Sequence, residues 1–318
     1  MSGNLQRALY PVRARGNEGR TRGTMSRLDE VAGARMGKHT TIGIGGASER
    51  LVFPRSVREV QDVLASERAA NRKVRALGAG SNLLVSDGGV RGTVVCLRKN
   101  MGNVLFAPGG EVVADAGVMV PRFAVLCALS ALSGVEELGG IPGTVGGLLT
   151  MNAGSYGRSI GEIVEWLEIV DYEGRLHRVG ASEVRFSYRT AEYPVRGIIV
   201  RAGFRLRPGK SDEAFSRMKA LNERRRAKQP WGERTFGSTF RNPQGDENAA
   251  ALLERAGMKG AREGDAIFSE KHANFMINKG RATSSEVLRL IARGREAVQT
   301  LSAITLSTEV EMWGIADE

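Results

Sequence analysis

Short apolar runs and amphipathic stretches follow one another along the chain, which predicts a mixture of strands and helices. The segments KVRAL, VRGTVVC, GEVVAD and GIIVRAGF are rich in the β-branched residues that favour strands. Ser56 and Glu59 have the spacing of a capping box, so we expect a helix from there to about residue 68. Thr283 and Glu286 repeat that spacing and predict another helix to about residue 299.

Several helix and turn signals complete this pattern. Pro121 suits the first turn of a helix over PRFAVLCALSAL, and Glu173-Gly174 predicts the turn of a hairpin. A charged helix should run through SDEAFSRMKALNERRRAK and end before Pro230, and ENAAALLERA should form a helix that ends at Gly257. LSTEVEMWG predicts a closing strand. Because strands and helices do not alternate steadily, the α+β class is favoured over a doubly wound sheet.

The composition changes near residues 207–211, where we place a domain boundary. We expect a first domain over 25–207, with lobes over 25–97 and 98–207, and a second over 208–318. Residues 1–24 carry five arginines and one acid without an apolar period, which is typical of a disordered basic tail. They contain no apolar segment of the kind found in a signal peptide.

Charge and cysteine content narrow the function classes. The formal net charge of +11 is compatible with nucleic acid or with small anionic substrates, but only 6% of residues are aromatic, so stacking platforms for bases are scarce. No apolar run reaches the roughly 18 residues that suggest a membrane span. Cys96 and Cys127 belong to no CxxC or Cys/His pattern, so we expect buried thiols in a reducing cytoplasm and no metal site.

Three glycine-rich segments are the main chemical signal: TIGIGGASE (41–49), GAGSN (78–82) and GGIPGTVGG (139–147). Backbone N–H groups in such loops can converge on phosphate oxygens. No GK[ST] follows, and Leu83 stands where a dinucleotide fingerprint has its third glycine, so neither standard phosphate motif is present. Each segment alone is compatible with a tight turn. Together they suggest one extended ligand with the length and two phosphates of a dinucleotide.

Eight blocks in order between about residues 38 and 314 resemble the UDP-N-acetylenolpyruvoylglucosamine reductase family. They are TTIGIGGASERLVFP, LGAGSNLLVSDGGVRG, GGIPGTVGGLLTMNAGSYG, FSYR, GSTFRNP, LLERAGMKG, KHANFMIN and LSTEVEMWG. The resemblance implies a two-lobed FAD-binding domain of the vanillyl-alcohol-oxidase type and a C-terminal α+β substrate-binding domain. The short segment between FSYR and IIVRAGF resembles the family's shorter form, which lacks a tyrosine-bearing lid.

The resemblance also implies an activity. Members of this family are bacterial cytoplasmic enzymes of peptidoglycan synthesis. They reduce the enolpyruvyl ether of a UDP-sugar to UDP-N-acetylmuramate, with NADPH as co-substrate and non-covalent FAD as the hydride carrier. We therefore expect a monomer that binds a small UDP-sugar and neither nucleic acid nor a membrane.

Site residues follow from the resemblance by position. Arg189, Ser238 and Glu309 match the family's catalytic arginine, proton donor and catalytic glutamate. Without the resemblance, these residues would be interpreted as a surface cation, a turn serine and an exposed edge glutamate. Expected FAD contacts are Ile44, Gly45, Gly46, Gly78, Ala79, Gly80, Ser81, Asn82, Gly139, Ile141, Pro142, Gly143, Thr144, Val145, Gly146, Gly147, Asn152, Ala153 and Gly154. Expected substrate contacts are Tyr188, Lys228, Asn242, Lys259 and His272.

Two departures and two alternatives stay open. Ala191 stands where a serine is usual in the family, and Glu311 stands where some relatives have a basic residue, so substrate affinity is in question at both. A flavin oxidase of the same superfold is one alternative, although the glycine segments offer no His or Cys at a matching place for a covalent flavin. A nucleic-acid-binding module, suggested by the charge, is the other.

Overall fold

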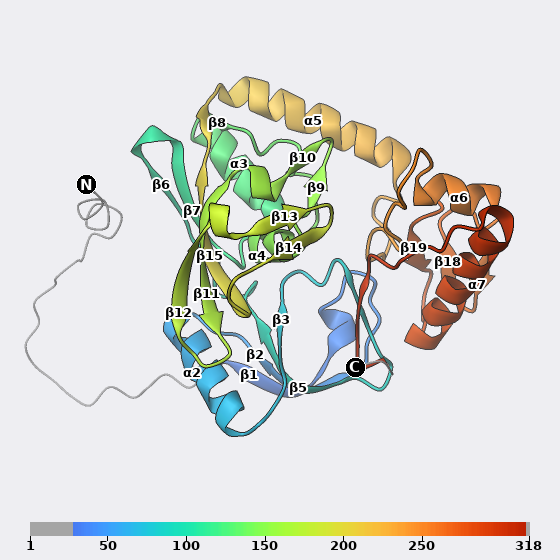
Figure 1. Ribbon diagram of the computed structural model, residues 1–318, viewed down its shortest axis with the longest axis horizontal. Helices are drawn as coiled ribbons and strands as arrows, with labels where there is room; N and C mark the ends of the chain where they lie inside the picture. Colours follow the sequence, from blue (N-terminus) through green and yellow to red (C-terminus); the bar gives the residue numbers. More distant parts are fainter. Residues whose placement is uncertain (1–27, 316–318) are drawn as a thin grey trace, which may run out of the picture.

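The computed structural model describes residues 28–315; the expected basic tail and residues 25–27 lie outside this range. The first lobe is a four-stranded sheet in which β1 is antiparallel to β2 and the other pairs are parallel (Figure 1). In sheet order its strands are β1 (Glu30–Arg35), β2 (Ala47–Val52), β5 (Val90–Cys96) and β3 (Val74–Leu77). Short 3-10 helix η1 (Met36–Lys38) follows β1.

The second lobe is a five-stranded antiparallel sheet. In sheet order its strands are β12 (Leu176–Gly180), β11 (Val164–Asp171), β15 (Gly197–Arg205), β7 (Glu111–Asp115) and β6 (Val104–Ala107). Its core also takes buried side chains from helices α2 (Val57–Ala69), α3 (Val120–Leu129), α4 (Val145–Thr150) and α5 (Ser211–Lys228). Because α2 follows β2 in the chain yet packs in this core, it ties the two lobes together.

Several short elements decorate the second lobe. The paired strands are β8 (Leu132–Ser133) with β16 (Arg207–Pro208), β9 (Gly154–Ser155) with β10 (Arg158–Ser159), and β13 (Arg185–Ser187) with β14 (Thr190–Glu192). The 3-10 helices are η2 (Pro108–Gly110), η3 (Ile160–Glu162) and η4 (Ala181–Glu183). The long helix α5 crosses the top of this lobe and leads the chain to the remaining domain (Figure 1).

The C-terminal part has its own apolar core, built on a small antiparallel sheet and two helices. These elements are α6 (Ala249–Arg255), β17 (Arg262–Glu263), β18 (Ala266–Phe268), β19 (Met276–Asn278) and α7 (Ser284–Ser302). Ile42 and Ile44, from the segment between β1 and β2, are buried in this core, so the first lobe and the C-terminal part interlock.

The chain then returns to the first lobe. Strand β20 (Glu311–Trp313) pairs in parallel with β4 (Leu83–Val85), and Trp313 is only 4% exposed among first-lobe side chains. The expected strand over LSTEVEMWG is therefore wrong for residues 306–310, which form no regular strand. The last strand, β20, therefore contributes Trp313 to the core of the first lobe and not to the core of the C-terminal part.

Most sequence-based elements are confirmed, including the Ser56 and Thr283 helix caps and the helix that starts near Pro121. The helix α4, inside a segment expected to be a glycine loop, was not predicted. The domain boundaries stay a prediction; Ala214 and Met218 of α5 are buried in the second-lobe core. No helix among the described residues is long and apolar enough to cross a membrane.

Trp313 provides a test of the returning strand. We expect Trp313→Ala to lower the free energy of unfolding by about 3–5 kcal/mol, because it removes a large buried aromatic side chain. Trp231→Ala is the matched control, since Trp231 is 52% exposed, and should cost less than about 1 kcal/mol. Denaturant titration of both variants measures the difference; equal stabilities would contradict the role given to β20.

Candidate active site

Two of the glycine segments face each other. The loop of residues 78–82 joins β3 to β4, and a Cβ placed on Gly78 would lie 2.5 Å from the Oγ1 of Thr144. A Cβ on Gly143 would lie 3.8 Å from the Oγ of Ser81. The fold therefore brings residues 78–82 and 139–147 to one place, as the sequence suggested.

The loop of residues 78–82 has the properties of an anion site. None of the five backbone N–H groups from Gly78 to Asn82 donates a hydrogen bond to another described residue. Ala79 and Gly80 are nevertheless buried, and buried N–H groups are almost always paired in folded proteins. A group of unpaired donors in a loop is the arrangement that binds phosphate oxygens. The loop thus fits the diphosphate of a dinucleotide.

Gly80 shows why this loop cannot carry a side chain at its bend. Its φ is +64°, and a Cβ there would lie 2.2 Å from the carbonyl oxygen of His39. The amide of Thr41 also donates to the carbonyl oxygen of Gly80, at 3.1 Å. The segment after β1 therefore packs against the loop of residues 78–82, which we call the phosphate loop. At position 80 both packing and backbone conformation require glycine.

At the start of α4, by contrast, the protein itself explains the glycine. The amide of Gly146 donates to the carbonyl oxygen of Ala116 at 2.8 Å, and a Cβ on Gly146 would lie 2.8 Å from that of Ala116. Packing against Ala116 is therefore enough to explain the missing side chain at Gly146, and the expected contact of Gly146 with FAD stays a prediction. At Gly147 a Cβ would meet only the Oγ1 of Thr144, at 3.3 Å, so this position is open to a ligand.

The third glycine segment touches the loop of residues 78–82 through Thr41, but its residues 44–46 line a separate cavity. Ile44, Gly45 and Gly46 line a cavity of about 820 Å³ together with basic residues that include Arg35 and Lys38. No residue of 78–82 or 139–147 lines this cavity. The expected FAD contacts of residues 44–46 stay a prediction. The facing arrangement of the other two loops does not include these residues.

Two of the expected FAD contacts in the segment after α4, Asn152 and Ala153, have paired backbone amides. The amide of Asn152 donates to the carbonyl oxygen of Leu149 at 3.2 Å, and that of Ala153 donates to Leu148 at 2.8 Å. Both N–H groups are therefore already used within the protein. The side chain of Asn152 is buried, and the expected contacts of Asn152 and Ala153 with FAD stay a prediction.

Arg189 and Glu309 form an ion pair although 120 residues separate them in sequence. The Nε of Arg189 donates to the Oε1 of Glu309 at 3.0 Å, and the side chains are 23% and 11% exposed. Arg189 lies in the turn between β13 and β14 with φ of +54°, a conformation that costs a non-glycine residue about 1–3 kcal/mol. Strain of this kind is concentrated at functional sites.

Ser238 directly precedes Thr239, which forms a backbone hydrogen bond with Glu309. The amide of Glu309 donates to the carbonyl oxygen of Thr239 at 2.9 Å, and Ser238 itself forms a bridge with Phe275. A Cβ on Gly237 would lie 3.8 Å from the carbonyl oxygen of Ser81. The three expected catalytic residues thus come from segments that meet beside the phosphate loop.

Burial dominates the electrostatics of this pair. It raises the pKa of the Glu309 carboxyl above its ordinary value, while the guanidinium groups of Arg189 and Arg241 act in the opposite direction. The carboxyl group therefore holds its proton more readily than an exposed glutamate does. A titratable group perturbed in this way, with a specific charged partner, is typical of a functional site.

The expected substrate residues have different surroundings. Tyr188 is 55% exposed and Lys228 is exposed at the end of α5, so both are accessible. The Oδ1 of Asn242 accepts from the amide of Ala249 at 3.1 Å, and Lys259 pairs with Glu254 at 2.7 Å. Burial lowers the pKa of His272, whose buried Nδ1 has no partner among the described residues. His272 is therefore neutral near pH 7.

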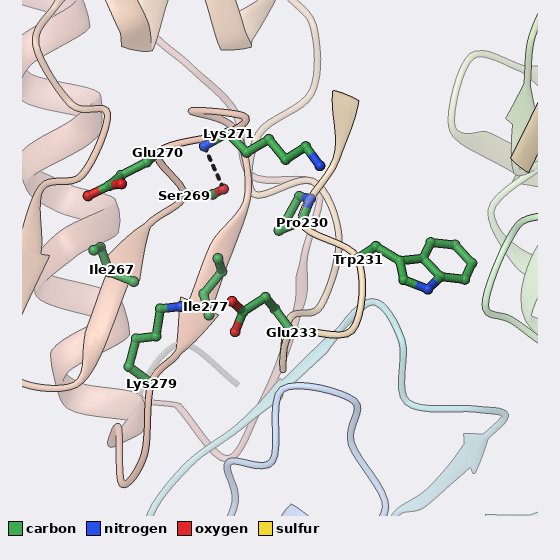
Figure 2. Close-up of a pocket in the computed structure, with 9 residues that line it drawn as sticks. All are labelled: Pro230, Trp231, Glu233, Ile267, Ser269, Glu270, Lys271, Ile277 and Lys279. Carbon is green, nitrogen blue, oxygen red and sulfur yellow. Dashed lines mark hydrogen bonds and ion pairs between the residues drawn. The ribbon is translucent and has the colours of Figure 1, made fainter. Parts of the chain in front are cut away.

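A pocket lies where the chain leaves α5 and meets the C-terminal sheet. Figure 2 shows its lining, in which Trp231 points away from the other side chains and the amide of Lys271 donates to the Oγ of Ser269 at 3.1 Å. Its volume is about 440 Å³. Lys228 and His272 flank the lining segments in sequence, so the pocket adjoins the region expected to bind the substrate.

Sequence reasoning did not single out Arg225 from the basic run at the end of α5. Its Nη2 donates to the Oγ of Ser155 at 2.7 Å, and its buried Nε has no partner among the described residues. A Cβ on Gly140 would lie 2.9 Å from that Nε. The guanidinium therefore faces the glycine segment. The sequence could not show this, because residues 224–226 are all arginines and nothing local distinguishes the one that points inward.

Comparisons with known proteins agree with this geometry. A family model described as an FAD binding domain matches residues 48–180, and one described as the C-terminal domain of UDP-N-acetylenolpyruvoylglucosamine reductase matches residues 229–313. The reductase of that name from Moorella thermoacetica is 39% identical over 288 residues, which cover 91% of this chain and 94% of that protein. The reductase from Alkalilimnicola ehrlichii is 40% identical over 281 residues, 88% and 93% of the two chains.

A solved structure gives the same result. The crystal structure of UDP-N-acetylenolpyruvylglucosamine reductase from Thermus caldophilus matches with a TM-score of 0.76 and 33% identity, covering 90% of this chain and 99% of that one. The fold and the site thus define an FAD-dependent oxidoreductase with an α+β architecture. Within that class, the chain belongs to the UDP-N-acetylenolpyruvoylglucosamine reductase family.

Adjacent glycines of α4 test the two explanations for missing side chains. In flavin-free protein, Gly146→Ala should lower the free energy of unfolding by about 1–3 kcal/mol, because the new methyl group is forced against Ala116. Gly147→Ala, the matched control, should cost less than about 1 kcal/mol in that form. It should instead weaken FAD binding, measured by fluorescence titration. A stable Gly146→Ala variant would contradict the packing explanation.

The ion pair predicts a change in titration. Arg189→Gln removes a positive charge that favours the ionised carboxylate, so the pKa of Glu309 should rise further. The carboxyl band in infrared difference spectra, assigned with Glu309→Gln, measures this. Arg185→Gln on the same hairpin is the control, since its side chain is 82% exposed, and should leave the titration unchanged. A fall in the pKa of Glu309 in Arg189→Gln would refute the assignment.

Proposed function

We propose that this protein reduces UDP-N-acetylenolpyruvoylglucosamine to UDP-N-acetylmuramate, using NADPH and bound FAD, in the synthesis of peptidoglycan precursors. The observation that carries the proposal is the ion pair between Arg189 and Glu309, held beside a loop of unpaired amides. A dinucleotide diphosphate on that loop would place its flavin end in the region where the catalytic segments meet.

Bound FAD supplies a hydride carrier that NADPH reduces and the enolpyruvyl group oxidises. The loop of residues 78–82 would hold the diphosphate with its free N–H groups, and Gly147 of α4 offers an open approach for the ring system. The charge of Arg225 lies next to the same glycine segment and favours an anionic cofactor. The chain's donors therefore match the chemistry of FAD.

Arg189 would bind the carboxylate of the enolpyruvyl group. When a hydride is added at C3 of that group, negative charge develops at C2 and on the carboxylate. A guanidinium can donate two hydrogen bonds to a carboxylate and stays charged throughout. Its Nε is already engaged by Glu309, which fixes the plane of the group and leaves its terminal nitrogens for the substrate. Stabilisation of developing charge is usually the largest catalytic contribution.

Ser238 would donate the proton that completes the reaction at C2. A serine hydroxyl is a weak acid, so this donation depends on the high basicity of the enolate and on neighbouring charge. Glu309, whose pKa burial raises, lies on the segment bonded to Thr239 and can exchange a proton there or orient Arg189. Tyr188, Lys228, Asn242, Lys259 and His272 are the proposed contacts to the UDP-sugar.

The remaining proposals concern context. We expect the protein to act as a monomer in the cytoplasm on a small UDP-sugar, and to bind neither nucleic acid nor a membrane. Of the residues in doubt, Ala191 lies in β14 opposite Phe186, and the carboxylate of Glu311 accepts from the indole Nε1 of Trp313 at 2.7 Å. Glu311 is thus occupied by a structural contact near the catalytic segment.

The decisive experiment follows the flavin colour. Protein purified with FAD should lose its yellow flavin absorbance when NADPH is added without oxygen. The colour should return only when UDP-N-acetylenolpyruvoylglucosamine is supplied. Flavin that oxygen reoxidises rapidly, with no effect of the enolpyruvyl nucleotide, would point to an oxidase and refute the proposal.

Ser238→Ala separates the two halves of the cycle. Reduction of FAD by NADPH should proceed at the wild-type rate, because the serine acts only on the second substrate. Reoxidation by the enolpyruvyl nucleotide should slow by about 10²–10⁴-fold, the usual contribution of a placed proton donor. Ser307→Ala, an exposed serine near Glu309, is the control and should leave both rates unchanged. Equal slowing of both half-reactions in Ser238→Ala would remove the assigned role.

A further inference from the structure

Two asparagines from the cofactor-binding segments donate side-chain hydrogen bonds to the main chain on either side of the ion pair. Asn82 is the last residue of the phosphate loop, and Asn152 follows α4. Each donates its Nδ2 to a main-chain carbonyl oxygen, Asn82 to Glu309 and Asn152 to Ser187. One amide thus holds the segment of the glutamate, and the other holds the hairpin that carries Arg189.

Asn82 fixes the returning chain at two points. Its Nδ2 lies 3.0 Å from the carbonyl oxygen of Glu309, and its own carbonyl oxygen accepts from the amide of Glu311, also at 3.0 Å. The amide of Glu309 itself is bonded to Thr239. The main chain at Glu309 is therefore held on both sides, which limits where its carboxylate can lie.

Asn152 holds the opposite segment. Its side chain is buried at 7% exposure; its Oδ1 accepts from the amide of Gly161 at 3.1 Å, and its Nδ2 donates to the carbonyl oxygen of Ser187 at 2.8 Å. Its φ of +43° is a conformation that asparagine tolerates better than most residues. A buried side chain that must both accept and donate specifies an amide and excludes an ionised carboxylate.

We propose that Asn82 and Asn152 are positioning residues that set the distance and orientation of Arg189 and Glu309. The inference rests on the proposed function of that pair. It assigns to both asparagine side chains a task distinct from cofactor contact. Because both lie on the segments that meet the dinucleotide, the same elements that hold the cofactor also align the groups that act on the second substrate.

The test uses half-reactions of the FAD-loaded protein. Asn82→Ala and Asn152→Gly remove the amides, and glycine keeps the positive φ at residue 152 accessible. Reduction of FAD by NADPH should change less than twofold, whereas reoxidation by the enolpyruvyl nucleotide should slow about 10-fold or more, since each loss removes a hydrogen bond that holds one segment of the ion pair. Asn100→Asp is the matched control: Asn100 donates to the carbonyl oxygen of Phe53 at 2.8 Å, away from the pair.

Asn152→Asp adds a readout that general loosening cannot produce. In this variant the ionised carboxylate cannot donate to Ser187, but the protonated acid can, and burial raises the pKa of the introduced group. Reoxidation by this variant should therefore recover as the pH is lowered, while Asn152→Gly shows no such recovery. The charged groups near this position are Arg189 with Glu309 on the hairpin side, and Glu162 with Arg158 beside Gly161. Arg189→Lys in the same background identifies any contribution of that pair to the profile.

A measurement without turnover completes the design. The Nε–H resonance of Arg189, assigned by its loss in Arg189→Lys, should shift in each asparagine variant and stay in place in Asn100→Asp. Wild-type reoxidation rates and an unmoved arginine resonance in Asn82→Ala and Asn152→Gly would overturn the inference. If wild-type flavin is not reoxidised by the enolpyruvyl nucleotide at all, the proposed function fails instead, and the arginine resonance still decides whether the asparagines position the pair.

Discussion

The parallel pairing of β20 with β4 is the constraint on which the site depends. The segment that carries Glu309 follows the C-terminal core in the chain, and this pairing holds it against the first lobe. The pairing brings Glu311 beside Leu83, directly after the phosphate loop. Trp313 anchors the strand in the first-lobe core, so the segment that carries Glu309 is held by apolar burial as well as by hydrogen bonds. One short strand therefore connects the C-terminal part to the first lobe and places Glu309 beside the loop of residues 78–82.

The site stores unfavourable interactions that the rest of the fold must offset. Arg189 adopts a left-handed conformation, and Glu309 is a mostly buried carboxylate. A buried ion pair contributes little net stability, because desolvation of both charges opposes their attraction. The three apolar cores supply the stability instead. Retaining strain and buried charge at the point where cofactor loops converge is intelligible if both serve the reaction.

Sequence reasoning predicted local features far better than contacts between distant segments. Helix caps at Ser56 and Thr283 depend on residues three apart, so their signals lie within one turn. The resemblance supplied Arg189, Ser238 and Glu309, and the structure brings their segments together. Nothing local distinguishes Arg225 from its basic neighbours or reveals that β20 returns to the first lobe. Sequence also cannot separate the two possible causes of the glycine at position 146, because a close contact with Ala116 and a bound ligand both require a missing side chain.

The form of the loop of residues 78–82 indicates which kind of phosphate group it would suit. A loop that transfers phosphate needs a lysine and a magnesium ligand to neutralise charge that develops on the leaving oxygens. Residues 78–82 provide backbone dipoles and small polar side chains, and they have neither group. Dipoles fixed by β3, β4 and the bend at Gly80 stabilise a constant charge without reorganising. Such a loop suits a diphosphate that remains chemically unchanged, as the diphosphate of a flavin dinucleotide does when the proposed reaction takes place at its ring.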